Sequence, residues 1–237
     1  MIVGGRVKTI GLIGGMSWES TVTYYQLINQ RVKLLCGGLH SAKIVLHSVD
    51  FHEIEQYHRS GEWELAGNIL TQAAGGLVRA GADFLVLCTN TMHKVAPQIE
   101  ASCSIPLLHI ADVTAAKIKS AGFSSIGLLG TRFTMEQEFY VDRLRERHGL
   151  NVLVPDTAAR EQIHRIIYEE LCLGQVEPSS RRVYQQAIAE LARRGAQGVV
   201  FGCTEISMLV GAADSPVPVF DTTQIHADAA VDRALEA

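Results

Sequence analysis

The chain has 237 residues, of which 47% are hydrophobic and 19% charged, and its formal net charge is −4. This composition is typical of a water-soluble globular protein, and the weak negative charge without a basic cluster argues against a nucleic-acid-binding surface. No apolar run is long enough for a membrane span, and no signal-peptide pattern precedes Gly15. The five cysteines form no CxxC pair, so we expect reduced thiols in a cytoplasmic protein.

Short apolar strands alternate with helical segments along the first half of the chain. The predicted strands are 9–14, 43–48, 84–87 and 106–109, and the predicted helices are 21–35, 62–79, 92–101 and 113–121. Ser17 or Ser20 is expected to cap the first helix, and the histidine-rich segment 50–59 is predicted as a polar loop. The glycines at 11, 14 and 15 do not form GxGxxG, which argues against dinucleotide binding.

The second half of the chain repeats this order. The predicted strands are 125–131, 152–154, 198–201 and 218–220, and the predicted helices are 135–147, 158–173, 179–194 and 223–236. Three segments recur at nearly constant spacing: 9–15 at an offset of 116, 80–91 at 114, and 106–108 at 112. We interpret this repeat as a duplication.

The duplication predicts an α/β protein of two pseudo-symmetric Rossmann-like lobes, each with a mostly parallel four-stranded sheet. The expected N-terminal lobe comprises residues 1–114 and the C-terminal helix 223–237, and the expected second lobe comprises residues 115–222. If the lobes face each other, the site is expected in the cleft between them, where small-molecule pockets usually lie.

Each half carries a polar turn at the carboxyl end of its third strand, the position where α/β sheets bind ligands. The turn Gly202-Cys203-Thr204-Glu205 matches the turn Cys88-Thr89-Asn90-Thr91 at an offset of 114, so that Cys203 corresponds to Thr89. A thiolate can act as a base where a helix N-terminus and N–H groups lower its pKa. One proton-transfer group on each side of a tetrahedral carbon suits racemisation or epimerisation. The alternative is a buried cysteine that packs as a small hydrophobe.

Hydroxyl and amide side chains near these turns are candidates for binding a substrate carboxylate. They are Asn90, Thr91, Thr131, Thr134 and Thr204. No lysine has a recognisable pyridoxal-phosphate context, which favours a mechanism without a cofactor, and the nine histidines show no metal-ligand spacing.

Four motifs resemble the aspartate/glutamate racemase family, in the same order and over nearly the whole chain. They are Gly14-Gly15-Met16-Ser17, Cys88-Thr89-Asn90-Thr91-Met92-His93, Gly130-Thr131 and Gly202-Cys203-Thr204-Glu205. The run Cys88–Lys94 is similar to that of bacterial L-aspartate/glutamate-specific racemases. The resemblance implies a pyridoxal-phosphate-independent homodimer, with Met16, Ser17 and Glu205 also at the substrate site.

The first turn departs from the family pattern, which places a cysteine in both positions. Here Thr89 takes that position, and the side chain of Cys88, one residue earlier, is expected to point away because extended chain alternates its side chains. Shifting the alignment by one would restore a cysteine but would break both the Asn90-Thr91 match and the repeat. By resemblance, Cys203 removes the α-proton of the L-enantiomer, and Thr89 returns a proton on the opposite face.

A substrate with two carboxylates also needs a cation or several donors for its distal carboxylate. The family takes a basic residue from the loop after the second strand, and His58 is the preferred candidate there, with His52 and Arg59 as alternatives. Arg160 and Arg165, on a later helix, are further candidates, although an arginine on a solvated helix face is the ordinary case.

Two other functions remain open from the sequence. One is a decarboxylase of the same superfamily, which resembles arylmalonate decarboxylase in keeping only the second thiol and protonating a carbanion from one face. The other is a non-catalytic amino-acid-binding protein. Carbon dioxide release from a malonate would indicate the first, and tight binding without isotope exchange the second.

Overall fold

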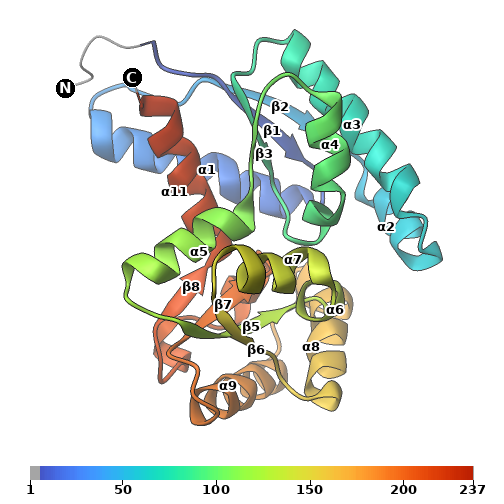
Figure 1. The fold of residues 1–237 in the computed structure, drawn as a ribbon, viewed down its shortest axis with the longest axis vertical. Helices are drawn as coiled ribbons and strands as arrows, with labels where there is room; N and C mark the ends of the chain where they lie inside the picture. The colour runs from blue at the N-terminus through green and yellow to red at the C-terminus, as the bar shows by residue number, and fades with distance from the viewer. Residues whose placement is uncertain (1–5, 237) are drawn as a thin grey trace. The chain divides into compact units, whose positions relative to one another are not determined.

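Two parallel four-stranded sheets organise the chain in the computed structural model, which describes residues 6–236 (Figure 1). The first sheet has the order β2-β1-β3-β4, with β1 (Ile10–Gly14), β2 (Ile44–Ser48), β3 (Phe84–Leu87) and β4 (Leu107–Leu108). The second has the order β6-β5-β7-β8, with β5 (Ser125–Gly130), β6 (Asn151–Leu153), β7 (Gly198–Gly202) and β8 (Val219–Asp221). The predicted fold class is confirmed.

Helices connect the strands in both halves. The first half contains α1 (Trp18–Cys36), α2 (Phe51–Ser60), α3 (Trp63–Arg79), the 3₁₀ turn η1 (Thr91–Val95), α4 (Ala96–Ser102) and α5 (Ile110–Ser120). The second half contains α6 (Arg132–Glu136), α7 (Glu138–Asp142), the π-helical turn η2 (Arg143–Arg147), α8 (Thr157–Glu169), η3 (Leu171–Leu173), α9 (Pro178–Arg193), α10 (Ile206–Leu209), η4 (Ala212–Asp214) and α11 (Thr222–Leu235). Within residues 6–236, none of these helices is long and apolar enough to cross a membrane.

The strand registers reproduce the sequence repeat. Ile10 of β1 pairs with Phe84 of β3, and Ile126 of β5 pairs with Gly198 of β7, which are the same positions at the offsets of 116 and 114. The β3–β4 and β7–β8 pairings agree in the same way with the offsets of 114 and 112. The chain therefore leaves β3 and β7 at equivalent points of the two sheets.

Both faces of the first sheet are covered by helices, because alternate strand residues point to opposite faces. Ile13 and Leu87 pack in one cluster with the buried faces of α3 and α4, and Ile10 and Leu12 pack in another with α1 and α11. Figure 1 shows α3 and α4 on one side of this sheet and α1 and α11 on the other. Burial on both faces explains why its central strands are continuous apolar runs.

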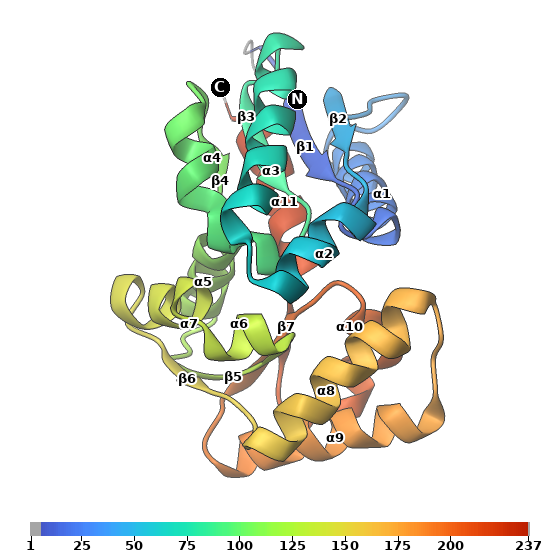
Figure 2. The same ribbon diagram turned by 90° about the vertical axis from the view of Figure 1, so that its right-hand side faces the viewer.

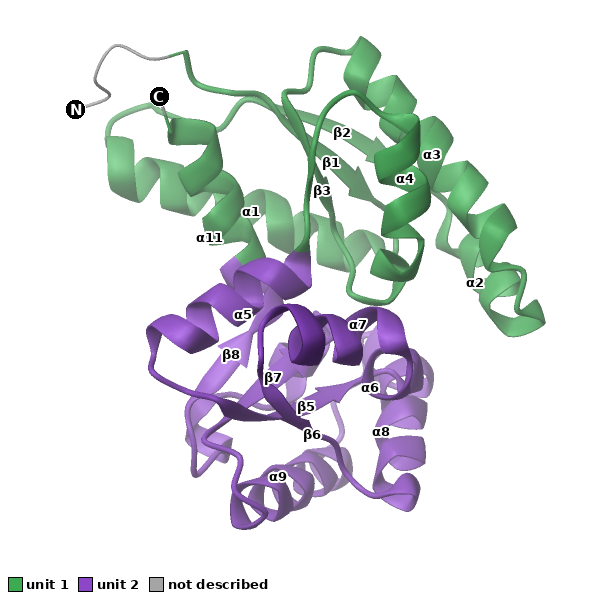
Figure 3. Ribbon diagram, viewed as in Figure 1, with its two compact units in different colours: residues 1–109, 226–237 green, residues 110–225 purple. Residues whose placement is uncertain are grey.

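The chain divides into two units, Met1–His109 with His226–Ala237, and Ile110–Ile225 (Figure 3). The expected boundaries at 114/115 and 222/223 differ because all of α5 belongs to the second unit. Its apolar residues lie in that unit's core: Ile110, Ala111, Ala115 and Ile118. The apolar residues of α11 lie in the first unit's core: Ala227, Ala230, Val231 and Ala234. In each half, the helix after the fourth strand therefore completes the other unit.

The predicted polar loop at 50–59 is wrong, since these residues form α2. The Asp50 side chain accepts a hydrogen bond from the His52 backbone N–H, which caps the helix, and Gly61 ends it in the left-handed region at φ 78°. Ile54 and His58, one turn apart, face the first unit's interior and are buried. The sequence contains both capping residues, but its polar composition led to the prediction of a loop.

The single helix predicted at 135–147 is also wrong, because α6, α7 and η2 share that segment and the helix begins earlier. Thr131 caps α6 by accepting a hydrogen bond from the Thr134 backbone N–H. Gln137 then adopts an extended conformation, φ −94° and ψ 146°, which separates α6 from α7. The predicted helix 92–101 is similarly divided into η1 and α4.

A buried histidine joins α11 to the first sheet. His226 is completely buried, and its Nε2 donates to the Leu108 carbonyl at 2.9 Å, which leaves Nδ1 to accept from the Tyr24 hydroxyl at 2.8 Å. Burial lowers the pKa of His226 to about 4 despite that carbonyl. Burial, together with the charge of Lys94, also lowers the pKa of His58 to about 4. Both imidazoles are therefore neutral at pH 7.

These lowered pKa values predict acid sensitivity of the fold. The folded pKa of each histidine lies below its unfolded value, so the neutral histidine contributes to stability fully above about pH 6.5. This contribution is lost as the pH falls toward 4. For a pKa shift of this size, each histidine lowers the free energy of unfolding by about 3 kcal/mol over that range. In His226→Gln, we expect the free energy of unfolding to fall less steeply over this range than in the parent. Urea titrations at several pH values measure it. The same pH dependence in both proteins would refute the assignment.

Candidate active site

The turn after β7 carries the predicted proton-transfer residue. β7 is buried along its whole length, and a Cβ on Gly202 would lie 3.0 Å from the Leu129 carbonyl and 3.2 Å from the Thr134 methyl group. Glycine therefore lets the strand end this close to β5, because a Cβ here would push its neighbours by a few tenths of an ångström. The next residue, Cys203, is half-buried at the carboxyl edge of the sheet.

Cys203 lies next to a carboxylate in this turn. The Cys203 thiol donates to Glu205 Oε2 at 2.9 Å, and the Thr204 hydroxyl donates to the same oxygen at 2.6 Å. Glu205 itself is buried. The local fold thus brings together the three side chains of the predicted motif, and the carboxylate is placed to receive the thiol proton.

The electrostatics of this turn oppose ionisation of the thiol. Burial raises the pKa of Cys203 well above its usual range, and the negative charge of Glu205 and the neighbouring Cys172 raise it further. The expectation of a lowered thiol pKa is wrong for this structure, in which Cys203 is a neutral thiol at pH 7. A positive charge brought close to Cys203 would favour its thiolate.

Two neighbours of Cys203 could not be predicted from the sequence. Cys172 comes from η3 and Tyr184 from α9, and burial followed by the charges of Cys203 and Glu205 raises the pKa of Tyr184 well above its usual range. Both side chains follow helical patterns that indicate ordinary core positions. Only the packing of these helices against β7 brings them near the turn.

The turn after β3 separates Cys88 from Thr89. Cys88 is completely buried in the core formed with α1 and α11, and burial raises the pKa of its thiol. Thr89 is half-buried at the edge of the sheet. The Cys88 side chain therefore points into the core and does not share the position of Thr89, as the sequence predicts.

Hydrogen bonds fix the backbone of Thr89 on both sides. Its N–H donates to the Leu87 carbonyl at 2.8 Å, and its carbonyl accepts from His93 Nδ1 at 2.8 Å. His93 is buried and packs edge-on against His109, with 4.5 Å between the ring centroids. Asn90 and Thr91, in the same turn, are buried too. Thr89 is therefore held on a rigid support.

The other predicted hydroxyls form two equivalent capping pairs. Ser17 caps α1 by accepting from the Ser20 N–H at 3.3 Å, which confirms the predicted cap. Thr131 accepts from the Thr134 N–H at 3.3 Å, and the offset between the pairs is 114. Thr134 is completely buried, so its hydroxyl supports Thr131, 3.2 Å away. Met16 is also buried and packs in the first unit's core.

His58 lies in an aromatic cluster. Its Nε2 is 2.7 Å from the Met92 sulfur, and its ring stacks on Trp63 with 4.7 Å between centroids. The Lys94 ammonium lies 4.0 Å from the centroid of the same Trp63 ring. Because His58 is neutral at pH 7, it can bind a carboxylate only as a hydrogen-bond donor.

The alternative cations are engaged elsewhere. Arg59 pairs with Glu55, Arg160 with Glu136 at 2.7 Å, and Arg165 with Glu169 at 4.0 Å. His52 is exposed and lies 2.9 Å from the Gln56 side-chain nitrogen.

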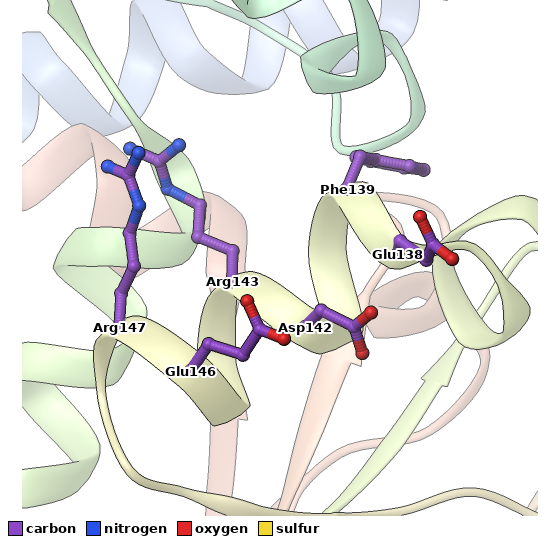
Figure 4. Close-up of a pocket in the computed structure, with 6 residues that line it drawn as sticks. All are labelled: Glu138, Phe139, Asp142, Arg143, Glu146 and Arg147. Atoms are coloured by element: carbon purple, nitrogen blue, oxygen red, sulfur yellow. The ribbon is translucent and has the colours of Figure 1, made fainter.

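A surface depression over α7 and η2 contains none of the predicted site residues. Figure 4 shows the side chains that line it: Glu138, Phe139, Asp142, Arg143, Glu146 and Arg147. Arg143 is already held by Asp112 through two contacts of 2.7 Å. Within residues 6–236, no group of three His, Cys, Asp or Glu side chains could hold a metal ion. The two strand-end turns remain the candidate catalytic groups.

Comparison with known proteins defines the class. The model of the Asp/Glu/hydantoin racemase family matches residues 13–230, and the chain belongs to this family. A broad specificity amino-acid racemase of Bacillus subtilis is 21% identical over 234 residues, covering 95% of this chain and 98% of that protein. The chain is thus an isomerase, a racemase of amino acids.

Solved structures support the same assignment. A candidate Asp/Glu racemase from Yersinia pestis is 61% identical, with a TM-score of 0.92 over 97% of this chain and 100% of the other. An aspartate racemase homologue from Pyrococcus horikoshii is 33% identical, with a TM-score of 0.82 over the same shares.

The contact between Cys203 and Glu205 predicts the reactivity of the thiol. Because the charge of Glu205 adds to burial in raising the pKa of Cys203, Glu205→Gln should lower that pKa and speed alkylation of Cys203 by iodoacetamide. The gain is about three- to fourfold for each pKa unit while the thiol remains mostly protonated, because a thiolate of lower pKa is less nucleophilic. Mass spectrometry measures the rate against Cys103 in the same molecule. Equal rates in parent and variant would refute the electrostatic effect.

Proposed function

We propose that the chain racemises acidic amino acids, aspartate and glutamate, without pyridoxal phosphate. Cys203 removes the α-proton of the L-enantiomer, and Thr89 acts on the opposite face of the same carbon. We also propose that the enzyme works in the cytoplasm as a homodimer, as its reduced cysteines and its resemblance to the family suggest.

The observation that carries the proposal is the equivalence of the two strand-end turns. The registers of β3 on β1 and of β7 on β5 give Thr89 and Cys203 the same place in their sheets, at the offset of 114. A racemase needs one proton-transfer group for each face of its substrate. The duplicated fold provides two such positions.

Glu205 provides the proton acceptor that the Cys203 thiol needs because its pKa is raised. In the proposed sequence, the Cys203 thiol passes its proton to the Glu205 carboxylate, 2.9 Å away, as the substrate ammonium group arrives. The resulting thiolate takes the α-proton and becomes a thiol again, and the electron pair remains on the substrate as a carbanion. Hydrogen bonds to the α-carboxylate spread this charge, for which the donors are Asn90, Thr91, Thr131 and Thr204.

The hydroxyl of Thr89 makes the two directions unequal. An aliphatic hydroxyl is far too weak a base to remove an α-proton at pH 7, but it relays a proton from water to the carbanion. The hydroxide that remains is neutralised by the proton held on Glu205, which restores the thiol and the carboxylate. Since an enzyme cannot change the equilibrium between enantiomers, the asymmetry appears in the rates of proton exchange. Exchange of the L-enantiomer through Cys203 is expected to outpace its inversion.

The α-proton exchange itself tests the proposal. In deuterated water, L-aspartate and L-glutamate should exchange rapidly and the D-acids slowly, and Cys203→Ser should lose the L-exchange by about a thousandfold or more, because a hydroxyl replaces the thiol that takes the α-proton. NMR follows the loss of the α-proton signal. Equal exchange from D- and L-acids would disprove the one-sided mechanism. No exchange from any of the four acids would favour the decarboxylase or the binding protein.

A pair of variants in the first turn separates the two alignments. Thr89→Cys places a thiol at the position equivalent to Cys203 and should increase exchange of the D-acids. Cys88→Ala should leave exchange within about twofold of the parent but lower the free energy of unfolding by about 1–2 kcal/mol, because it leaves a small cavity in the core. Loss of exchange in a folded Cys88→Ala protein would show that Cys88 is the reacting group.

A further inference from the structure

A half-buried cation lies beside the turn that carries Thr89. Lys94 belongs to η1, five residues after Thr89, and its Nζ lies 4.0 Å from the centroid of the Trp63 ring. Trp63 is the first residue of α3 and stacks on His58 of α2, with 4.7 Å between centroids and 24° between planes. Elements from three parts of the first unit therefore meet around this ammonium group.

The positive charge of this cluster resides on Lys94. His58 is buried, and its Nε2 is 2.7 Å from the Met92 sulfur, so that ring is fixed. Burial and the charge of Lys94 together keep His58 neutral at pH 7. An ammonium over an aromatic face is attracted by the ring electrons, which holds it in place.

The ammonium of Lys94 has no carboxylate partner among residues 6–236. In the part of the chain that the structure describes, no ion pair includes Lys94, whereas Arg59, Arg160 and Arg165 each pair with a carboxylate. Burial also lowers the pKa of Lys94, because its ammonium has lost water contacts without gaining an anion. A carboxylate bound next to Lys94 would compensate the ammonium for its lost hydration.

We propose that Lys94 binds the distal carboxylate of an acidic amino-acid substrate, and that Trp63 and His58 form the wall that holds its ammonium group. This inference rests on the proposed function, and it assigns specificity to a residue of η1 in place of His58. The Trp63 ring covers one side of the Lys94 ammonium, and the other N–H groups of the ammonium donate hydrogen bonds to the substrate carboxylate. A neutral side-chain amide would gain less from this charge, so Lys94 selects acids over amides.

Substitution of Lys94 tests the proposal by substrate charge. Lys94→Met keeps an apolar stem against Trp63 and removes the charge. For L-aspartate and L-glutamate, kcat/KM of α-proton exchange should fall about 10- to 100-fold, mostly through a higher KM, as expected for a lost hydrogen bond to a charged group. For L-asparagine and L-glutamine, it should change less than about threefold, and Lys94→Arg should restore much of the activity on the acids.

Two other variants provide the comparison. Lys117→Met makes the same charge change at an exposed position on α5 and should behave as the parent. Arg132 is the rival cation: it is the exposed first residue of α6, with its guanidinium carbon 5.9 Å from the Phe133 ring centroid. The variant Arg132→Met tests it. Equal losses for acids and amides, a loss confined to kcat, no loss, or a selective loss only in Arg132→Met would each overturn the assignment to Lys94.

Calorimetry separates this inference from the proposed function. If the parent exchanges neither L-aspartate nor L-glutamate, the proposed function fails, and binding of L-aspartate to the parent and to Lys94→Met then decides the inference alone. Weaker binding to Lys94→Met, with L-asparagine unaffected, supports it. Equal binding of L-aspartate to both proteins, or none to either, overturns it.

Discussion

The register of the central strands is the constraint on which the candidate site depends. In each sheet the third strand pairs with the first in parallel, and the pairings start at equivalent residues, Ile10 with Phe84 and Ile126 with Gly198. A shift of one residue would turn every side chain of β3 to the other face. Cys88 would then leave the core and take the place of Thr89. The apolar pattern of the strand therefore determines that Cys88 lies in the core and Thr89 at the edge of the sheet.

The surroundings of Cys203 in the second turn disfavour ionisation of its thiol. Low polarity around Cys203 and the nearby Glu205 carboxylate both favour the protonated thiol, so the substrate-free protein does not hold an exposed, reactive thiolate. Such a thiol is protected from oxidation and from stray alkylation. In the proposed mechanism, the same carboxylate that suppresses ionisation accepts the thiol proton when a cationic substrate binds. That mechanism makes the reactivity of the thiol depend on bound substrate.

The fold was largely predictable, because duplicated apolar strands are a strong pattern that few other folds share. The equivalence of Thr89 and Cys203 followed from the same repeat. Helix α2 was missed because its polar residues masked Asp50 and Gly61, which cap its two ends. The raised pKa of the Cys203 thiol was missed because it depends on burial and on Cys172, which comes from a distant helix. The surroundings of Lys94 were unpredictable for the same reason, since α2, α3 and η1 meet only in the folded unit.

The placement of α5 and α11 determines the order in which the two units can complete their cores during synthesis. The sequence repeat ends each half with a helix, yet α5 packs in the second unit and α11 in the first. All core residues of the second unit lie in one continuous stretch, Ile110–Ile225. The first unit instead needs α11, which is synthesised after the second unit, before Ile10, Leu12 and Phe84 can be covered. The first unit is therefore begun before the second and completed after it.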